Sequence, residues 1–277
     1  MYPRVELGAV TLYTYGLMLA IAFAAGIGLL CFELRRKGFN PSHGVWIGLI
    51  AIAGGVVGSR LLFIVEEWDR FVVEPASVIF SPGGLSFYGG LLLVVLAIYP
   101  YARWNGIGLL VFCDAAAPGL LLARGIGRIG CHLAGDGDYG LPTTLPWGTD
   151  YSNGVDPPSK VLLRLPELAG WVPGGVAYDH LPMHPTGVYE FLISAVLFAV
   201  LWRYRDRIRP AGRLFMLYLL ATGGIRFGLE FLALAPPIAL GLTEAQLTSL
   251  GLIVTGAVGL RQLSAHSASL SPLIRTR

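Results

Sequence analysis

The chain has 277 residues, of which 55% are hydrophobic and only 13% are charged, and its formal net charge is +3 at pH 7. Soluble globular domains carry roughly 25% charged residues, so this composition excludes a disordered chain and argues against a soluble domain. The basic residues form no continuous patch in a polar segment, which argues against a nucleic-acid partner, and three cysteines are too few for a disulfide framework.

Seven apolar runs approach or exceed the roughly 20 residues that a helix needs to cross a bilayer. The first run follows Arg4 and Glu6 without a basic n-region or an evident cleavage site, so we expect it to stay in the membrane. The segment 130–185 is rich in Pro, Gly and Asp, and we expect a folded extramembrane insert there. The runs cover residues 10–31, 44–65, 86–104, 106–127, 187–203, 212–233 and 238–260.

These features predict an all-α polytopic membrane protein with about seven transmembrane helices. Residues 1–277 are expected to form a single integral membrane domain, with the insert at 130–185 inside it. The loops after the first, third, fifth and seventh runs hold twelve basic residues, and the opposite loops hold four. Because basic loops stay in the cytoplasm, we predict an outer N-terminus, an outer insert and a cytoplasmic C-terminus.

Charged residues inside the apolar runs are the main functional signal. A charge in the hydrocarbon costs several kcal/mol, so such side chains usually face the bundle interior or a wet cavity. The residues concerned are Arg60, Arg124, Arg128, Arg226, Asp114, Glu190 and Glu230.

Arg124 and Arg128 are four residues apart, so on a helix they share one face. Their glycine-rich surroundings let another backbone or a lipid headgroup come close, and two guanidinium groups suit a phosphate because each donates bidentate hydrogen bonds. The alternative is that both arginines extend to the membrane interface or pair with Asp114 and Glu190.

Arg226 and Glu230 have the same spacing. A surface pair of this kind contributes only about 0.3–0.5 kcal/mol, too little to justify burying both charges, so we favour a cavity-lining role over a simple intrahelical pair. His184 is either a site residue or a turn residue before the fifth run. Glu190, just inside that run, needs a partner, and Arg128 and Arg226 are the candidates.

The Gly89-Gly90 step at the start of the third run permits irregular backbone or a tight helix contact. Tyr88, directly before it, fits either a site residue or a member of the aromatic belt.

Two other chemistries have weaker support. Cys131 has basic neighbours that would lower the pKa of a thiol, but no Cys-His-Asn arrangement accompanies it. A metal site would draw on His and Asp residues of the outer side, but their spacing matches no strong zinc signature, so we predict none. Those residues are His132, Asp136, Asp138, His180 and His184.

Taken together and in order, these motifs resemble the prolipoprotein diacylglyceryl transferase family over most of the chain. Tyr88 stands where the family often has a functional His, Cys131 where its signature commonly has Asn, and Thr222 where it often has Tyr. The signature stretch is one residue longer here, so its acidic position falls on Asp136 or Asp138. The matching motifs are Tyr15-Gly16, Gly89-Gly90-Leu91, Asp114 and Pro118 with Gly127-Arg128 and Gly140, His184-Pro185-Thr186 with Tyr189-Glu190, and Arg226-Phe227 with Glu230-Phe231.

The resemblance implies a transferase of lipoprotein biosynthesis in the bacterial cytoplasmic (inner) membrane. Such an enzyme moves the diacylglyceryl group of phosphatidylglycerol to the lipobox cysteine thiol in the signal peptide of a prolipoprotein. The reaction forms a thioether, releases glycerol phosphate and requires no metal or organic cofactor. The expected partners are these two substrates and membrane lipid.

From the resemblance and the charge pattern we expect Arg128 and Arg226 to stabilise the departing phosphate in a low-dielectric site. The expected catalytic residues are Arg128, Arg226, Tyr88 and Glu230. The expected substrate-binding residues are Arg128, Arg226, Tyr15, Gly89, Gly90, Asp136, Asp138, Gly140 and Glu190.

Several alternatives stay open. A neutral Tyr88, with a pKa of about 10, is a poor base at pH 7, so the acceptor of the thiol proton is Asp136, Asp138, His132, or water if the arginines lower the thiol pKa enough. A transporter or flippase of an anionic lipid would use the same arginines, a family paralogue would use another acceptor, and a scaffold would tolerate their loss.

Overall fold

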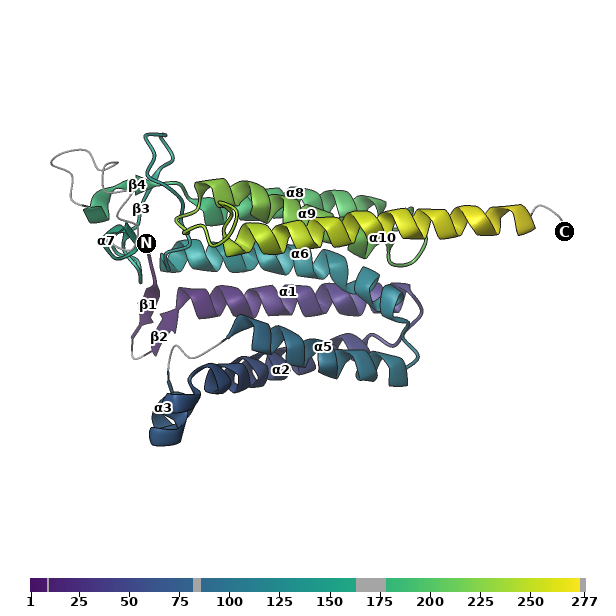
Figure 1. The fold of residues 1–277 in the computed structure, drawn as a ribbon, viewed down its shortest axis with the longest axis horizontal. Coiled ribbons are helices and arrows are strands. Elements are labelled where there is room, and N and C mark those ends of the chain that lie inside the picture. The colour runs from purple at the N-terminus through teal and green to yellow at the C-terminus, as the bar shows by residue number, and fades with distance from the viewer. Residues whose placement is uncertain (9, 82–85, 163–177, 275–277) are drawn as a thin grey trace. The chain divides into compact units, whose positions relative to one another are not determined.

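The computed structural model describes residues 1–8, 10–81, 86–162 and 178–274, and most of these residues are helical (Figure 1). Six helices are long and apolar enough to cross a membrane, which confirms a mostly helical, polytopic chain. Each of the first six predicted runs overlaps one of them. They are α1 (Thr14–Arg36), α2 (Ser42–Glu66), α5 (Phe87–Trp104), α6 (Leu109–Ala134), α8 (Thr186–Tyr204) and α9 (Arg213–Leu229), the last continued by the 3-10 turn η3 (Glu230–Leu232).

Three predicted boundaries were wrong. The first run begins with a strand, because β1 (Arg4–Leu7) pairs antiparallel with β2 (Val10–Tyr13). The fourth run continues as helix to Ala134, so the first residues of the predicted insert belong to α6. The seventh run corresponds to α10 (Glu244–Ile274), which starts later and is not among the six apolar helices.

The chain divides into two compact units, residues 1–26 with 116–277 and residues 27–115. In the second unit, α2 and α5 pack closely at Gly58 and Gly89, where a Cβ on either residue would meet the carbonyl oxygen of the other. Gly90 faces Ser59 in the same way, because its Cβ would lie 2.5 Å from Ser59 Oγ. The Gly89-Gly90 step is therefore a tight helix contact inside α5.

Elsewhere in this unit two short helices, α3 (Trp68–Val73) and α4 (Pro75–Ile79), follow α2. Arg60 of α2 donates to the carbonyl oxygens of Val78 at 3.2 Å and Ser81 at 3.0 Å, so this arginine anchors α4 and the residues directly after it. Tyr88 is half exposed, and its ring lies edge-on to that of Phe87 at 5.6 Å.

In the first unit the helices α6, α8 and α9 share a buried apolar core. Its buried members include Leu121 of α6, Leu201 of α8 and Ile225 of α9. Gly187, at the start of α8, is a second point of close approach, because a Cβ there would lie 2.6 Å from the carbonyl oxygen of Arg128. This contact brings the start of α8 against the part of α6 that carries the arginines.

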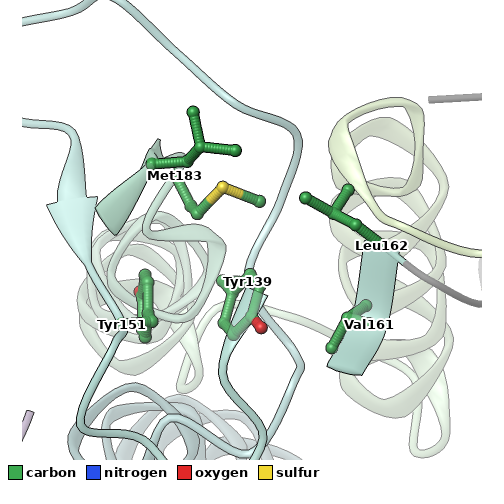
Figure 2. Close-up of a cluster of buried hydrophobic side chains, with 6 residues drawn as sticks. Tyr139, Tyr151, Val161, Leu162 and Met183 are labelled. Carbon is green, nitrogen blue, oxygen red and sulfur yellow. The ribbon is translucent and has the colours of Figure 1, made fainter. Parts of the chain in front are cut away.

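Between α6 and α8 the described residues form a small structure with a core of its own. The strands β3 (Thr149–Asp150) and β4 (Pro182–Met183) pair antiparallel, and the short helices α7 (Pro158–Leu162) and η2 (Tyr178–His180) lie between them in the chain. The rings of Tyr139 and Tyr151 stack 4.4 Å apart in this core (Figure 2). The core consists of Tyr139, Tyr151, Val161, Leu162, Leu181 and Met183.

Candidate functional site: an arginine-lined pocket

Glu190 of α8 holds two arginines of α6 with one carboxylate. Arg124 Nε lies 2.6 Å from its Oε1, and Arg128 Nε lies 3.0 Å from its Oε2. Glu190 is buried, so the pairing of both carboxylate oxygens compensates a charge that would otherwise be costly there. Of the two partners expected for Glu190, Arg128 and Arg226, the structure pairs it with Arg128. Arg124 also pairs with Glu190, as the alternative interpretation of the two α6 arginines expected.

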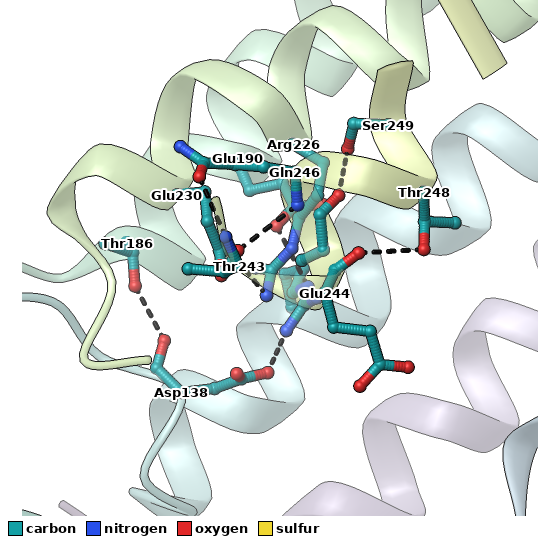
Figure 3. Close-up of polar contacts among 12 residues, drawn as sticks. Asp138, Thr186, Glu190, Arg226, Glu230, Thr243, Glu244, Gln246, Thr248 and Ser249 are labelled. Carbon is teal, nitrogen blue, oxygen red and sulfur yellow. Dashed lines mark hydrogen bonds and ion pairs between the residues drawn. The ribbon is translucent and has the colours of Figure 1, made fainter. Parts of the chain in front are cut away.

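A loop after α6 returns a second carboxylate to Arg128. Asp138 Oδ2 forms an ion pair with Arg128 Nη1. Gly135 and Gly137 adopt positive φ angles of 62° and 90°, which L side chains rarely adopt, and they give the loop its tight turns. Thr186 Oγ1 donates to the backbone carbonyl of Asp138 at 2.6 Å and fixes the loop to the start of α8 (Figure 3).

Arg226 of α9 has its own carboxylate. Its Nη2 lies 3.0 Å from Oε2 of Glu230, which is buried, and Thr243 Oγ1 donates to Oε1 of Glu230 at 2.8 Å (Figure 3). Thr243 also opens a capping box for α10, because its Oγ1 accepts from the backbone N–H of Gln246 at 3.2 Å and its own N–H donates to the Gln246 side chain at 3.1 Å. Sequence reasoning missed this support, although Thr-x-x-Gln is the pattern of such a box.

These ion pairs surround a small pocket of about 60 Å³ in the first unit. Four of the expected site residues meet here: Arg128, Asp138, Glu190 and Arg226. Apolar side chains from the end of α9 and the residues after it line the rest of the pocket. The full lining is Arg128, Gly137, Asp138, Tyr139, Thr186, Gly187, Glu190, Arg226, Leu229, Ala233, Leu234 and Ala235. The arrangement suits an anionic group with an apolar body, since fixed guanidinium groups lie beside an apolar wall.

Three further expected residues lie near the same end of α6. Tyr15 of α1 packs against Gly130, whose Cβ would lie 3.4 Å from the tyrosine ring. Burial raises the pKa of the Asp136 carboxyl above its ordinary value, and the hydrogen bond that the Cys131 thiol donates to it partly opposes this shift. Gly140 has a packing reason to be glycine, because a Cβ there would lie 2.6 Å from the Leu232 carbonyl oxygen. Tyr88, Gly89 and Gly90 belong to the second unit.

The histidines of the metal interpretation have other partners in the structure. Nδ1 of His132 lies 2.8 Å from the Tyr151 hydroxyl, Nδ1 of His184 lies 3.2 Å from the Tyr189 hydroxyl, and Nδ1 of His180 lies 3.0 Å from Asp150 Oδ2. The donor atoms that do come together, within 4.8 Å of one another, are those of Cys131, Asp136 and Asp138. Asp138 is paired with Arg128, so the positive charge of that guanidinium already lies beside these three donor atoms.

Comparison with known proteins identifies the family of the chain. The family described as "Prolipoprotein diacylglyceryl transferase" matches residues 4–261. Relatives named phosphatidylglycerol–prolipoprotein diacylglyceryl transferase include that of Clostridium tetani, 31% identical over 91% of this chain and 93% of the relative. That of Gloeobacter violaceus is 34% identical over 95% and 93%, and that of Bordetella avium is 31% identical over 96% of each. Since the match extends over nearly the whole chain, this protein belongs to the prolipoprotein diacylglyceryl transferase family.

Proposed function

We propose that this protein transfers the diacylglyceryl group of phosphatidylglycerol to the lipobox cysteine of a prolipoprotein, the first step of lipoprotein maturation. The thiolate sulfur forms a bond to the glycerol carbon of the diacylglyceryl group. The bond from that carbon to the phosphate oxygen breaks, and glycerol phosphate leaves with the electron pair. The observation that carries the proposal is the pocket that Arg128 and Arg226 line from two different helices.

The two arginines bind the phosphate and stabilise the charge that grows on its oxygen as the bond breaks. Donors that are already fixed in place need no rearrangement at that moment, which makes them effective in a site with little water. Glu190 fixes Arg128 and Glu230 fixes Arg226, each with a buried carboxylate. The two glutamates are therefore positioning residues, and the arginines are the catalytic groups.

Asp136 accepts the proton of the substrate thiol. Of the other residues open for this role, His132 is engaged with the Tyr151 hydroxyl, and Asp138 is paired with Arg128 until the phosphate takes its place. The Asp136 carboxylate already accepts a hydrogen bond from a thiol, that of Cys131, and burial raises its pKa above the ordinary value. A raised pKa makes a carboxylate a stronger base, closer to the pKa of about 8.5 of a cysteine thiol.

The protein works as one domain of the bacterial cytoplasmic membrane, with its N-terminus and residues 130–185 outside and its C-terminus inside. The six apolar helices support a multi-pass protein, and α10 supplies the seventh crossing. The unequal number of basic residues in the loops supports the orientation. A precursor that has been exported would reach the pocket from the outer side, and phospholipid would enter from the membrane.

The test is a transfer assay read by mass spectrometry, with purified protein, phosphatidylglycerol and a lipobox peptide. We expect the cysteine of the peptide to gain the mass of a diacylglyceryl group, and a Cys→Ser peptide to gain none. Arg128→Ala should abolish the gain and still fold, because Glu190 keeps Arg124 as a partner. Folded wild-type protein that modifies no peptide, but moves phosphatidylglycerol between vesicle leaflets, would overturn the proposal in favour of a flippase.

A further inference from the structure

Arg124 of α6 has a positive charge to which the proposed mechanism gives no role. It lies one turn before Arg128, about 6 Å closer to the middle of the helix, and it is not among the described residues that line the pocket. Its Nε lies 2.6 Å from Oε1 of Glu190, whose side chain is 3% exposed. A charge at this depth of an apolar helix is costly and usually marks a functional residue.

Close packing of α8 on α6 holds the two ends of this ion pair together. A Cβ on Gly125 would lie 3.1 Å from the Cβ of Ser194, and one on Gly187 would lie 2.6 Å from the carbonyl oxygen of Arg128. Glu190 lies between these two contacts along α8, so its carboxylate is fixed beside both arginines of α6. Arg124 therefore acts on the pocket through Glu190.

The charges on Arg128 balance only if Arg124 is counted. Glu190 is buried and stays on Arg128, whereas Asp138 is partly exposed and is the carboxylate that a phosphate can replace. Without Arg124, Glu190 would cancel the charge of Arg128, and no positive charge would be left for the phosphate. With Arg124 on the other oxygen of Glu190, the charge of Arg128 is left over.

The other ion pairs near the pocket, among the described residues, leave no positive charge over. Arg226 is paired one to one with Glu230, which is buried. In the insert, Lys160 Nζ lies 3.3 Å from Oδ1 of Asp156. Asp136 adds a negative charge when it is ionised, so the need for an arginine without a carboxylate of its own becomes greater.

We propose that Arg124 is a positioning residue of the transfer reaction, which neutralises Glu190 so that Arg128 presents its full charge to the phosphate. The inference rests on the proposed function, since it takes a phosphodiester as the ligand. When the bond from the glycerol carbon to the phosphate oxygen breaks, that oxygen keeps the electron pair, and the phosphate changes from a monoanion to a dianion. Arg124 therefore stabilises the leaving group more than the bound lipid.

The first test asks whether the effect of Arg124 grows with the charge of the ligand. Arg124→Met should raise the KM for phosphatidylglycerol, a monoanion, about tenfold. It should weaken inhibition by glycerol phosphate, a dianion above its second pKa of about 6, about a hundredfold, because the Coulomb energy doubles with the ligand charge. Arg124→Lys keeps the charge and should keep both values. Arg203→Met, at the other end of α8, is the matched control for the loss of one exposed arginine.

The second test restores the charge balance. Glu190→Gln in the Arg124→Met background still offers an amide oxygen to Arg128 and leaves the charge of Arg128 over. We expect this double variant to recover most of the affinity for glycerol phosphate that Arg124→Met loses. Isothermal titration calorimetry with glycerol phosphate measures this affinity without transfer, and thermal unfolding in detergent shows that each variant is folded.

Equal losses for the monoanion and the dianion, or a double variant that binds glycerol phosphate no better than Arg124→Met, would overturn the role of Arg124 while the proposed function stands. If Arg124→Met does not fold, the double variant decides alone, because it has no carboxylate at position 190 to leave buried. Charge-dependent binding by a protein that transfers nothing would support the role of Arg124 and contradict the proposed function. Wild-type protein that binds neither anion would overturn both.

Discussion

At the scale of single residues, the two carboxylates on Arg128 differ in a way that matters for ligand binding. Glu190 has a side chain that is 3% exposed, whereas that of Asp138 is 43% exposed. The backbone of Asp138 is held by Thr186, so its side chain can turn away without moving the loop. A phosphate that approaches Arg128 therefore displaces Asp138 and leaves Glu190 in place.

This difference predicts that Asp138 competes with the phosphate for Arg128. Asp138→Asn should lower the KM for phosphatidylglycerol by roughly threefold to fivefold, because an exposed ion pair is typically worth up to about 1 kcal/mol. The measurement is the steady-state rate at varied phosphatidylglycerol and fixed peptide concentration. A higher KM in this variant would show that Asp138 contributes to binding directly, as the sequence alone suggested.

Arg226 and Glu230 form an ion pair, so each compensates the charge of the other. Their roles are therefore tested by comparing a single variant with a double variant. Arg226→Ala should lower stability by roughly 3–5 kcal/mol, since among the described residues it leaves the buried Glu230 with the Thr243 hydroxyl as its side-chain partner. The double variant Arg226→Ala, Glu230→Gln should recover most of that stability and still transfer no diacylglyceryl group. Thermal unfolding in detergent measures the first effect and the peptide assay the second. Activity in the folded double variant would remove Arg226 from the mechanism.

The raised pKa of Asp136 predicts how the transfer rate depends on pH on the acid side. Because burial raises the pKa of its carboxyl, the base should lose its proton only at a pH above the ordinary value of about 3.9, and transfer should decline as pH falls through the raised pKa. Because the folded protein binds this proton more tightly than the unfolded chain does, protonation of Asp136 raises the free energy of unfolding as the pH falls. Asp136→Asn should have a low rate without this acid decline. A profile that is identical in the wild type and in Asp136→Asn would exclude Asp136 as the base.

At the scale of elements, the site depends on how closely α8 approaches α6. Gly187→Ala should push the helices apart at the Arg128 carbonyl, which a Cβ would reach at 2.6 Å, and lower stability by about 1–3 kcal/mol. The transfer rate should fall as well, because Glu190 lies one turn further along the same helix. Gly251→Ala is the control, since its surroundings are open and alanine favours a helix by about 0.5–1 kcal/mol. Equal melting temperatures of the two variants would contradict this account.

The sequence predicts the helices well and their contacts only in part. Apolar runs of sufficient length locate six helices, since backbone hydrogen bonds must be satisfied inside each segment. The sequence does not predict the end of α6, because Arg128 looks like the edge of a span. In the structure Glu190, from a distant part of the chain, and Asp138, from the loop after α6, compensate its charge. The 62-residue separation of Arg128 and Glu190 also explains why spacing alone left two partners open for Glu190. By contrast, the local pair of Arg226 and Glu230 follows directly from a spacing of four.

At the scale of the whole molecule, the topology depends on whether α10 crosses the membrane. Six crossings would put both chain ends on the same side, and seven would put them on opposite sides. The helix α10 packs antiparallel along α9: a Cβ on Gly223 would lie 2.8 Å from the Ser249 carbonyl oxygen, and one on Gly256 would lie 2.8 Å from that of Met216. Since α9 is one of the apolar helices, this packing favours a position of residues 249–256 of α10 at the same depth as α9.

We therefore expect α10 to cross, with Arg261 and Arg213 together at the cytoplasmic end of the α9–α10 pair. A fluorescent protein that folds only in the cytoplasm should fluoresce when fused to the C-terminus, because twelve basic residues mark that side. Asn153→Cys, in an exposed position of the outer insert, should react with a membrane-impermeant thiol reagent in intact cells, with the wild-type protein as the control for the native cysteines. A dark fusion together with a reactive Cys at 153 would place both ends outside, and α10 would then lie against α9 without crossing.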